Sequence, residues 1–374
     1  MIGRPGSAGT AEVPEAFPFD APRLLAEHYG RVPTSITMTP RGHTNRSAFV
    51  DCDGEALVLR CSWAGKPDAT IDREERLLAY LAAEAPEVPV PRIVPTLHGG
   101  CHVRLPEVAG DSPRRIGRPI TRPRFVHLFR RLPGEPRYGW KGPCSAEHAH
   151  AAGAVLARLH AALRGARDVP GADPLGITRE RLLHLDRAAA QDAALRLEST
   201  LGDSMPRFFA IAEGLLDDTR GLPDEGPVQW VHGDFQLENL LFCGGEVSGV
   251  VDFDGARAGT PALDLAFALF SVARCGHVER CFTFDDALFR AGLEGYRSTA
   301  RQAEMTAAPG ALCSADLGAP GSGSSMDGRT AILDRLERLY CLDQALMHLD
   351  AHARGIWRLE AGIGFLPCVR RVLA

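Results

Sequence analysis

The sequence predicts an α+β fold with two lobes, a small N-terminal lobe built on a β-sheet and a larger, mainly helical C-terminal lobe. Two observations lead to this prediction. Strand-like runs dominate up to about residue 130, whereas helical periodicity dominates from Ala146 onward. The chain also has 374 residues, of which 45% are hydrophobic and 24% are charged, which is sufficient for two lobes with separate cores.

The N-terminal lobe is expected to cover residues 17–134. A first helix is predicted from Asp20, a suitable N-cap, to Tyr29, with Gly30 as the stop signal. Asp53-Gly54 is a strong hairpin signal between two strand-like runs. Strands are expected at 35–39, 47–51, 56–60, 101–105 and 125–129, with a helix over 71–83.

The C-terminal lobe is expected to cover residues 135–374. Apolar residues at helical spacing predict helices over 149–163, 177–197, 203–216, 263–272, 287–301 and 331–353. Two strands, 240–242 and 247–253, are expected to form a pair turned by Cys243-Gly244-Gly245.

Three segments lack these patterns. Residues 1–16 are rich in Gly, Pro and Ala and are predicted to be disordered, and residues 306–327 contain the flexible loop sequence APGSGSS. An insertion at 106–124 is interpreted as a solvated loop, with an anion- or peptide-binding segment as the alternative. Its arginines are Arg114, Arg115, Arg118, Arg122 and Arg124.

The composition indicates in which compartment the protein is expected and which classes of partner are excluded. The N-terminus lacks the apolar stretch of a signal peptide, and no apolar run reaches membrane-spanning length, so no membrane association is expected. The ten cysteines form no CxxC pair, which is typical of reduced thiols in a cytoplasmic protein. The net charge of −5 argues against nucleic acid as the main partner.

Charge is divided unevenly along the chain. Residues 1–142 hold 20 basic and 16 acidic residues, a net charge of +4, whereas residues 143–374 hold 22 basic and 31 acidic residues, a net charge of −9. A basic first part suits a polyphosphate, and an acidic second part would attract a cationic or amine-bearing acceptor. Ordinary scatter of charges is the alternative interpretation of the acidic part.

The most informative pattern is the run WVHGDFQLEN at 230–239, followed by Asp252 in the run VDFD. Phosphoryl transfer needs a carboxylate that orients the attacking hydroxyl and oxygen ligands that hold magnesium against the nucleotide phosphates. Asp234 is suited to the first task, and Asn239 and Asp252 are suited to the second. The spacing therefore predicts a kinase-like phosphotransferase that uses ATP, with GTP as an alternative, and Mg²⁺.

The ordered set from His232 through Asn239 and Asp252 to Asp264-Leu265-Ala266 resembles the aminoglycoside phosphotransferase and choline kinase-like superfamily. The resemblance runs from about Pro33 to the end of the chain. It implies a two-lobed protein kinase-like fold and a small-molecule acceptor. It also implies that Asp234 is the catalytic-loop aspartate and that Asn239 and Asp252 are the metal ligands.

The resemblance assigns supporting roles to three further residues. His232 is expected to hold the catalytic loop through hydrogen bonds, because a neutral histidine is a poor magnesium ligand. Asp264 is expected to cap the loop backbone. Asp254 is expected on the same strand face as Asp252, where it would assist the metal or contact the acceptor.

In the N-terminal lobe the resemblance implies nucleotide contacts. The loop that would cover the phosphates contains Gly42 and Asn45, and Arg60 stands where protein kinases have a strand lysine. An arginine can bind phosphate through two nitrogens, and a surface ion pair is the alternative. The partner of Arg60 is expected to be Glu74, with Glu75 as a rival. The hinge facing the adenine is expected around Arg131.

The expected activity is phosphorylation of a hydroxyl on a small molecule, such as an aminoglycoside or another amine-bearing metabolite, in antibiotic resistance or in biosynthesis. Alternatives are a Ser/Thr-peptide kinase of modified-peptide biosynthesis, a homoserine- or choline-type metabolic kinase, and a non-catalytic pseudokinase. The acids Asp343, Asp350 and Glu360 are interpreted mainly as a solvated helix face, with an acceptor pocket as the alternative. The sequence leaves the oligomeric state open.

Overall fold

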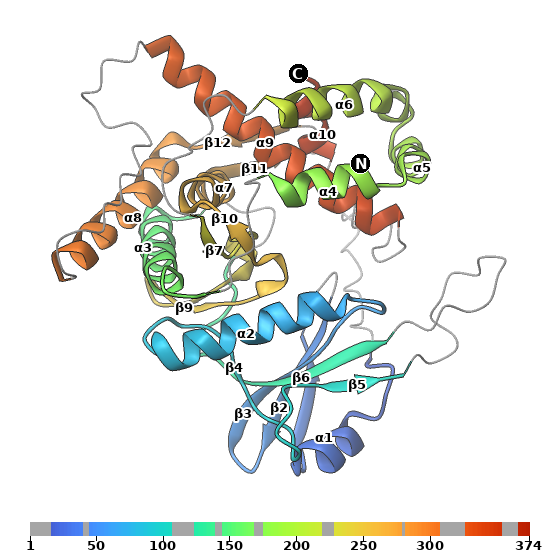
Figure 1. Ribbon diagram of the computed structural model, residues 1–374, viewed down its shortest axis with the longest axis vertical. Helices are drawn as coiled ribbons and strands as arrows, with labels where there is room; N and C mark the ends of the chain where they lie inside the picture. The colour runs from blue at the N-terminus through green and yellow to red at the C-terminus, as the bar shows by residue number, and fades with distance from the viewer. Residues whose placement is uncertain are drawn as a thin grey trace, which may run out of the picture. The chain divides into compact units, whose positions relative to one another are not determined.

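The computed structural model describes residues 16–39, 45–106, 123–138, 144–167, 175–218, 228–278, 281–306, 326–353 and 366–374 (Figure 1). The chain forms two compact units. Unit 1 takes residues 1–67 and 93–131, and unit 2 takes residues 68–92 and 132–374. The expected lobes, 17–134 and 135–374, differ from these units mainly in residues 68–92. Those residues carry helix α2 (Asp68–Glu84), which packs against α3 and η2 of unit 2.

Unit 1 contains a sheet whose strands follow the order β1-β2-β3-β6-β4, with β5 paired to β6. The pairs β1–β2, β2–β3, β3–β6 and β5–β6 are antiparallel. The elements are α1 (Ala21–Tyr29), β1 (Ser35–Met38), β2 (Arg46–Cys52), β3 (Glu55–Cys61), β4 (Arg92–Ile93), β5 (Val103–Leu105) and β6 (Arg124–Arg130).

Local signals account for the first elements of unit 1. The side chain of Asp20 accepts a hydrogen bond from the Arg23 amide, and Gly30 ends α1 at a φ of 64°. Asp53 and Gly54 have φ values of 52° and 83°, the left-handed pair that a two-residue hairpin turn requires. Both predictions are confirmed.

Helix α1 covers the sheet of unit 1 with its apolar side. Leu25 and Tyr29 are buried in one cluster with Leu57, Leu59 and Val126 of the strands. The Tyr29 hydroxyl donates a hydrogen bond to the Val126 carbonyl (3.1 Å), which satisfies a polar group inside this core.

Unit 2 is mainly helical, as predicted. Its remaining helices are α3 (Ala146–Leu163), α4 (Gly176–His184), α5 (Arg187–Leu197), α6 (Ser199–Asp217), α7 (Pro261–Ala273), α8 (Asp286–Thr306), α9 (Met326–Ala353) and α10 (Leu366–Leu373). Within the described residues, three short antiparallel strand pairs accompany them. They are β7 (Gln229–Val231) with β10 (Arg257–Gly259), β8 (Leu240–Cys243) with β9 (Glu246–Val250), and β11 (Arg274–Val278) with β12 (Cys281–Phe284).

Two packing features hold unit 2 together. Helices α3 and α8 lie side by side (Figure 1), and a Cβ atom at Gly153 would collide with the carbonyl of Gly292, so glycine is required for this close approach. Helices α6, α7, α9 and α10 share one apolar core that contains Phe208, Phe270 and Tyr340.

Two sequence predictions are wrong in detail. The single helix expected over 177–197 is divided into α4 and α5, because Asp186 accepts a hydrogen bond from the Ala189 amide (3.0 Å) and caps a new helix. The strand expected over 247–253 ends at Val250. Asp252 adopts the left-handed conformation (φ 65°) and Asp254 lies in the 3₁₀ turn η2 (Phe253–Gly255), so the two acids do not share a strand face.

The irregular segments predicted at 1–16, 106–124 and 306–327 fall largely outside the described residues. Within the described stretches, no helix combines the length and apolar character that crossing a bilayer would need.

Candidate active site

The predicted catalytic residues gather around one loop of unit 2. The loop leaves β7 at Val231, forms the 3₁₀ turn η1 (Leu237–Asn239) and enters β8. Leu240 of β8 pairs with Val250 of β9, and the Val251 amide donates to the Asn239 carbonyl (2.9 Å). The β8–β9 hairpin therefore returns the chain to the loop and places Asp252 beside Asn239.

Two amide side chains fix the carboxylate of Asp234. Asn239 Nδ2 donates to the Asp234 carbonyl (2.8 Å) and to its Oδ2 (3.2 Å), and Gln236 Nε2 donates to Oδ1. Burial raises the pKa of Asp234 to about 7, although the Gln236 hydrogen bond and the positive charge of Arg181 act in the opposite direction. A carboxyl group with a pKa near neutrality is suited to taking a proton.

Asn239 and Asp252 offer the donor set that magnesium prefers. Because the amide nitrogen of Asn239 is bonded to Asp234, its Oδ1 is the atom left for a ligand. Asp252 contributes a carboxylate from a left-handed backbone conformation that is unusual for a residue with a Cβ. Hard oxygen ligands of this kind fit Mg²⁺.

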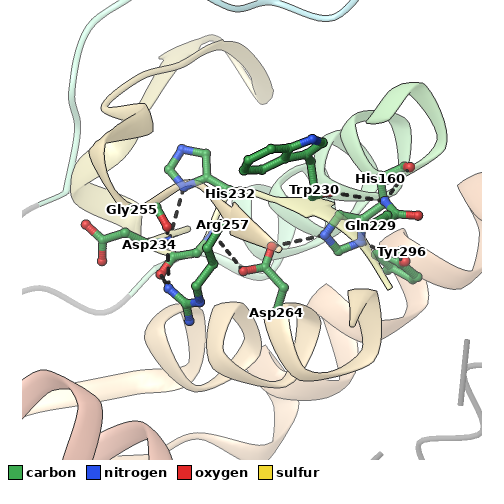
Figure 2. Close-up of polar contacts among 10 residues, drawn as sticks. His160, Gln229, Trp230, His232, Asp234, Gly255, Arg257, Asp264 and Tyr296 are labelled. Carbon is green, nitrogen blue, oxygen red and sulfur yellow. Dashed lines mark hydrogen bonds and ion pairs between the residues drawn. The ribbon is translucent and has the colours of Figure 1, made fainter. Parts of the chain in front are cut away.

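Buried polar contacts behind the loop fix its backbone (Figure 2). Asp264 on α7 accepts the Gly233 amide at Oδ1 (2.9 Å) and meets His160 Nε2 at Oδ2 (3.0 Å). His160 Nδ1 lies 2.9 Å from the hydroxyl of Tyr296. Burial by itself would raise the pKa of Asp264, but the hydrogen bond and charge of His160 and the charge of Arg257 outweigh it and hold the pKa below its usual range.

His232 has the contacts of a loop support. Its Nε2 donates to the Val251 carbonyl (3.2 Å), so its Nδ1 is free to accept the Asp234 amide (3.3 Å). Burial lowers the pKa of His232 to about 4, which keeps the ring neutral at physiological pH. The ring thus links Val251, the residue before Asp252, to the backbone of Asp234.

The sequence did not identify several residues of this site. Arg257 NH1 donates to the Gly233 carbonyl, and helix α9 contacts the loop through Gln344. Gln236 Nε2 donates to Gln344 Oε1 (3.2 Å). Glu238 pairs with buried Arg274 (2.7 Å), which also donates to the Tyr340 hydroxyl (3.1 Å). Apart from the position of Gln236 two residues after Asp234, these residues carry no local signal, because their partners are distant in sequence.

The interpretation of Asp343 as part of a solvated helix face is wrong. The residue is buried, and its Oδ1 accepts hydrogen bonds from Thr178 (2.7 Å) and Arg181 (2.8 Å) of α4. Asp350 is half-buried, and Glu360 lies outside the described residues.

Two arginines that are expected to contact the nucleotide lie over aromatic rings of unit 1. Arg60 on β3 holds its guanidinium 4.9 Å from the Phe129 ring centroid, and Arg131 lies 4.0 Å from that of Phe49. Asn45 is buried, and Gly42 lies outside the described residues.

The expected partner of Arg60 lies in the other unit. Glu74 is buried on α2, whereas its rival Glu75 is half-buried. Because β3 belongs to unit 1 and α2 to unit 2, the pairing of Arg60 with Glu74 stays a prediction.

Asp264→Ala is expected to lower the free energy of unfolding by about 3 kcal/mol, because it leaves the Gly233 amide and His160 without their buried partner. The native carboxyl has a lowered pKa, so its stabilisation is present above pH ~4 and is lost as the pH falls through the native value. Urea denaturation at pH 7 and pH 3.5 measures both effects. Asp203→Ala, an exposed site on α6, is the control, and equal stability of the two variants at pH 7 would contradict the prediction.

Comparison with known proteins finds curated relatives that match part of this chain. A homoserine kinase of Methylorubrum populi is 34% identical over 167 residues, which cover 44% of this chain and 48% of that protein. A homoserine kinase of Gluconacetobacter diazotrophicus is 32% identical over 183 residues, covering 47% and 50%. The chain therefore spans about half the length of the curated relatives it matches.

The fold is also found in solved structures. The gentamicin–APH(2″)-IIa complex aligns with 94% of this chain and 97% of that chain, with a TM-score of 0.54 and 15% sequence identity. At this identity the likeness shows the fold alone, which is the protein kinase-like fold that the sequence predicts. Residues 35–304, which include the loop, the β8–β9 hairpin and helix α7, match the family model described as the phosphotransferase enzyme family. The chain belongs to that phosphotransferase family.

Proposed function

We propose that the protein transfers the γ-phosphate of ATP, in the presence of Mg²⁺, to a hydroxyl group of a small amine-bearing molecule. The observation that carries the proposal is the arrangement of Asp234, whose carboxylate is held by two amide donors, beside the oxygen ligands of Asn239 and Asp252. GTP is the alternative nucleotide.

Each residue has a defined task in this proposal. Asp234 orients the acceptor hydroxyl and takes its proton as the oxygen attacks the γ-phosphorus, while the bond from that phosphorus to the bridging oxygen breaks and ADP leaves. Asn239 Oδ1 and the Asp252 carboxylate would hold a magnesium ion, which would offset the negative charge of the phosphates. Asp264 and His232 keep the loop backbone in place so that these groups do not have to reorganise during the reaction.

The curated relatives favour a metabolite over an antibiotic as acceptor. Both are named homoserine kinases, and their identity to this chain is 34% and 32%. The gentamicin complex resembles this chain only in fold. We therefore place small amino alcohols and hydroxy amino acids before aminoglycosides and peptides among the acceptors to be tested.

Transfer of labelled γ-phosphate from Mg·ATP to a panel of acceptors tests the proposal. The panel contains homoserine, amino alcohols, choline, aminoglycosides, sugars and Ser/Thr peptides, and Asp234→Asn is the control. Label on one hydroxyl class, lost in the control variant, is the expected result. Magnesium-dependent nucleotide binding without transfer to any acceptor would favour a pseudokinase instead.

A further inference from the structure

We propose that Arg181 and Asp343 form the acceptor subsite, where they bind the α-carboxylate and the α-ammonium group of a short hydroxy amino acid whose side-chain hydroxyl lies at Asp234. This inference rests on the proposed function and names the acceptor class within it.

The two side chains form an asymmetric ion pair between helices α4 and α9. Arg181 NH1 lies 2.8 Å from Asp343 Oδ1, which also accepts the Thr178 hydroxyl (2.7 Å). The side chain of Asp343 is 3% exposed, whereas that of Arg181 is 23% exposed. The carboxylate is therefore fixed inside unit 2, while part of the guanidinium reaches solvent and keeps donors for a ligand.

The second oxygen of Asp343 is also suited to a ligand. Both hydrogen bonds to this carboxylate converge on Oδ1, and no described residue donates to Oδ2. Burial by itself would raise the pKa of Asp343, but the charges of Arg181 and Arg257 and the Thr178 hydrogen bond outweigh it and keep the group ionised at neutral pH. An ionised oxygen of this kind can accept an ammonium group.

The ion pair lies close to the catalytic carboxylate. Asp343 is followed in α9 by Gln344, whose Oε1 accepts Gln236 Nε2 (3.2 Å), and the same nitrogen donates to Asp234. The charges of Arg181 and Asp343 both act on Asp234, the first lowering its pKa and the second raising it. An acceptor that reaches from Asp234 to the Arg181–Asp343 ion pair therefore needs only a short chain between its hydroxyl and its charged groups.

Charge complementarity then selects the acceptor class. A guanidinium binds a carboxylate through parallel N–H···O bonds, and a neighbouring carboxylate binds an ammonium group, so the pair matches both charges of an α-amino acid. A polycation without a carboxylate gains nothing from Arg181 and meets its positive charge. The subsite thus favours hydroxy amino acids over aminoglycosides.

Three probes that differ by one group test the proposal with ATP and Mg²⁺. They are L-homoserine, 3-amino-1-propanol, which lacks the carboxylate, and 4-hydroxybutanoate, which lacks the amine. We expect kcat/KM for homoserine to exceed that for either analogue by about 10- to 100-fold, the effect of one charge-assisted hydrogen bond. Arg181→Gln is expected to reduce the homoserine-to-aminopropanol ratio of kcat/KM by at least about 10-fold.

A paired variant separates ligand binding from charge balance. Arg181→Gln leaves Asp343 without its counter-ion, which by itself could disturb unit 2. In Arg181→Gln/Asp343→Asn the charges are balanced again, and Thr178 can still donate to the amide oxygen. If Arg181 binds the acceptor, the ratio of kcat/KM for homoserine to kcat/KM for 3-amino-1-propanol stays low in this double variant. Recovery of the wild-type ratio would show that Arg181 serves only as a counter-ion and would overturn the proposal.

The outcomes distinguish the two proposals. Transfer to 3-amino-1-propanol or to an aminoglycoside at least as efficient as transfer to homoserine would overturn the subsite and leave the phosphotransferase function standing. Absence of transfer to every hydroxyl acceptor in the panel would overturn the proposed function, and the subsite with it. Melting temperatures of all variants, measured in parallel, identify any variant that fails to fold.

Discussion

Replacement of Asp234 by asparagine is expected to reduce kcat by about 10²- to 10⁴-fold, the range usual for loss of a general base. The amide keeps the size of the side chain but cannot take the acceptor proton. One of the two amide donors of the native carboxylate, Gln236 or Asn239, can still bond to its remaining oxygen. Initial rates of phosphate transfer from labelled ATP to the acceptor found in the panel measure the effect.

The same variant is expected to bind nucleotide normally, because Asn239 and Asp252 are unchanged. Calorimetric titration with Mg·ATP checks this point. Asp203→Asn, the same exchange at an exposed position on α6, serves as the matched control and is expected to keep wild-type turnover. A kcat for Asp234→Asn within about threefold of the wild type would mean that Asp234 is not the general base.

Replacement of Asp252 by glycine is expected to abolish magnesium-dependent nucleotide binding and to reduce turnover by at least about 10³-fold. Stability should nevertheless change little. Asp252 has a φ of 65°, a conformation that glycine adopts without strain, which offsets the extra freedom of glycine in the unfolded chain. Nucleotide affinity with and without magnesium, together with the melting temperature, tests both statements.

Asp252→Asn separates charge from geometry at the same position. Asparagine tolerates the left-handed conformation and keeps one oxygen ligand but lacks the negative charge. We expect an intermediate loss of nucleotide affinity, larger in the presence of magnesium than in its absence. Unchanged magnesium dependence in both Asp252→Gly and Asp252→Asn would rule out Asp252 as a metal ligand.

Local signals in the sequence determined much of the fold. The hairpin at Asp53-Gly54 and the cap at Asp20 depend on conformational preferences that act within a few residues, so they could be predicted. The predicted trio of Asp234, Asn239 and Asp252 could be found for a similar reason. Asp234 and Asn239 share one loop, and the short β8–β9 hairpin returns the chain to it.

Only the tertiary structure decided how the rest of the site is built. Asp252 leaves the strand and turns into a left-handed conformation, although its neighbours have strand-like sequence. Helix α2 belongs to unit 2 although it stands between strands of unit 1. Neither feature follows from local preference, and α2 packs against α3 and η2, which lie far along the chain.

Asp343 shows most clearly where prediction from the sequence fails. Its place in a helix with many polar residues indicated exposure. Burial of its carboxylate is instead stabilised by hydrogen bonds from Thr178 and Arg181 and by the positive charge of Arg181. Both residues lie more than 160 positions earlier in the chain. The sequence by itself was sufficient to predict the fold class and the loop on which Asp234 and Asn239 lie. The tertiary structure decided which charges lie beside that loop, because the energy of a buried charge depends on partners that only folding brings together.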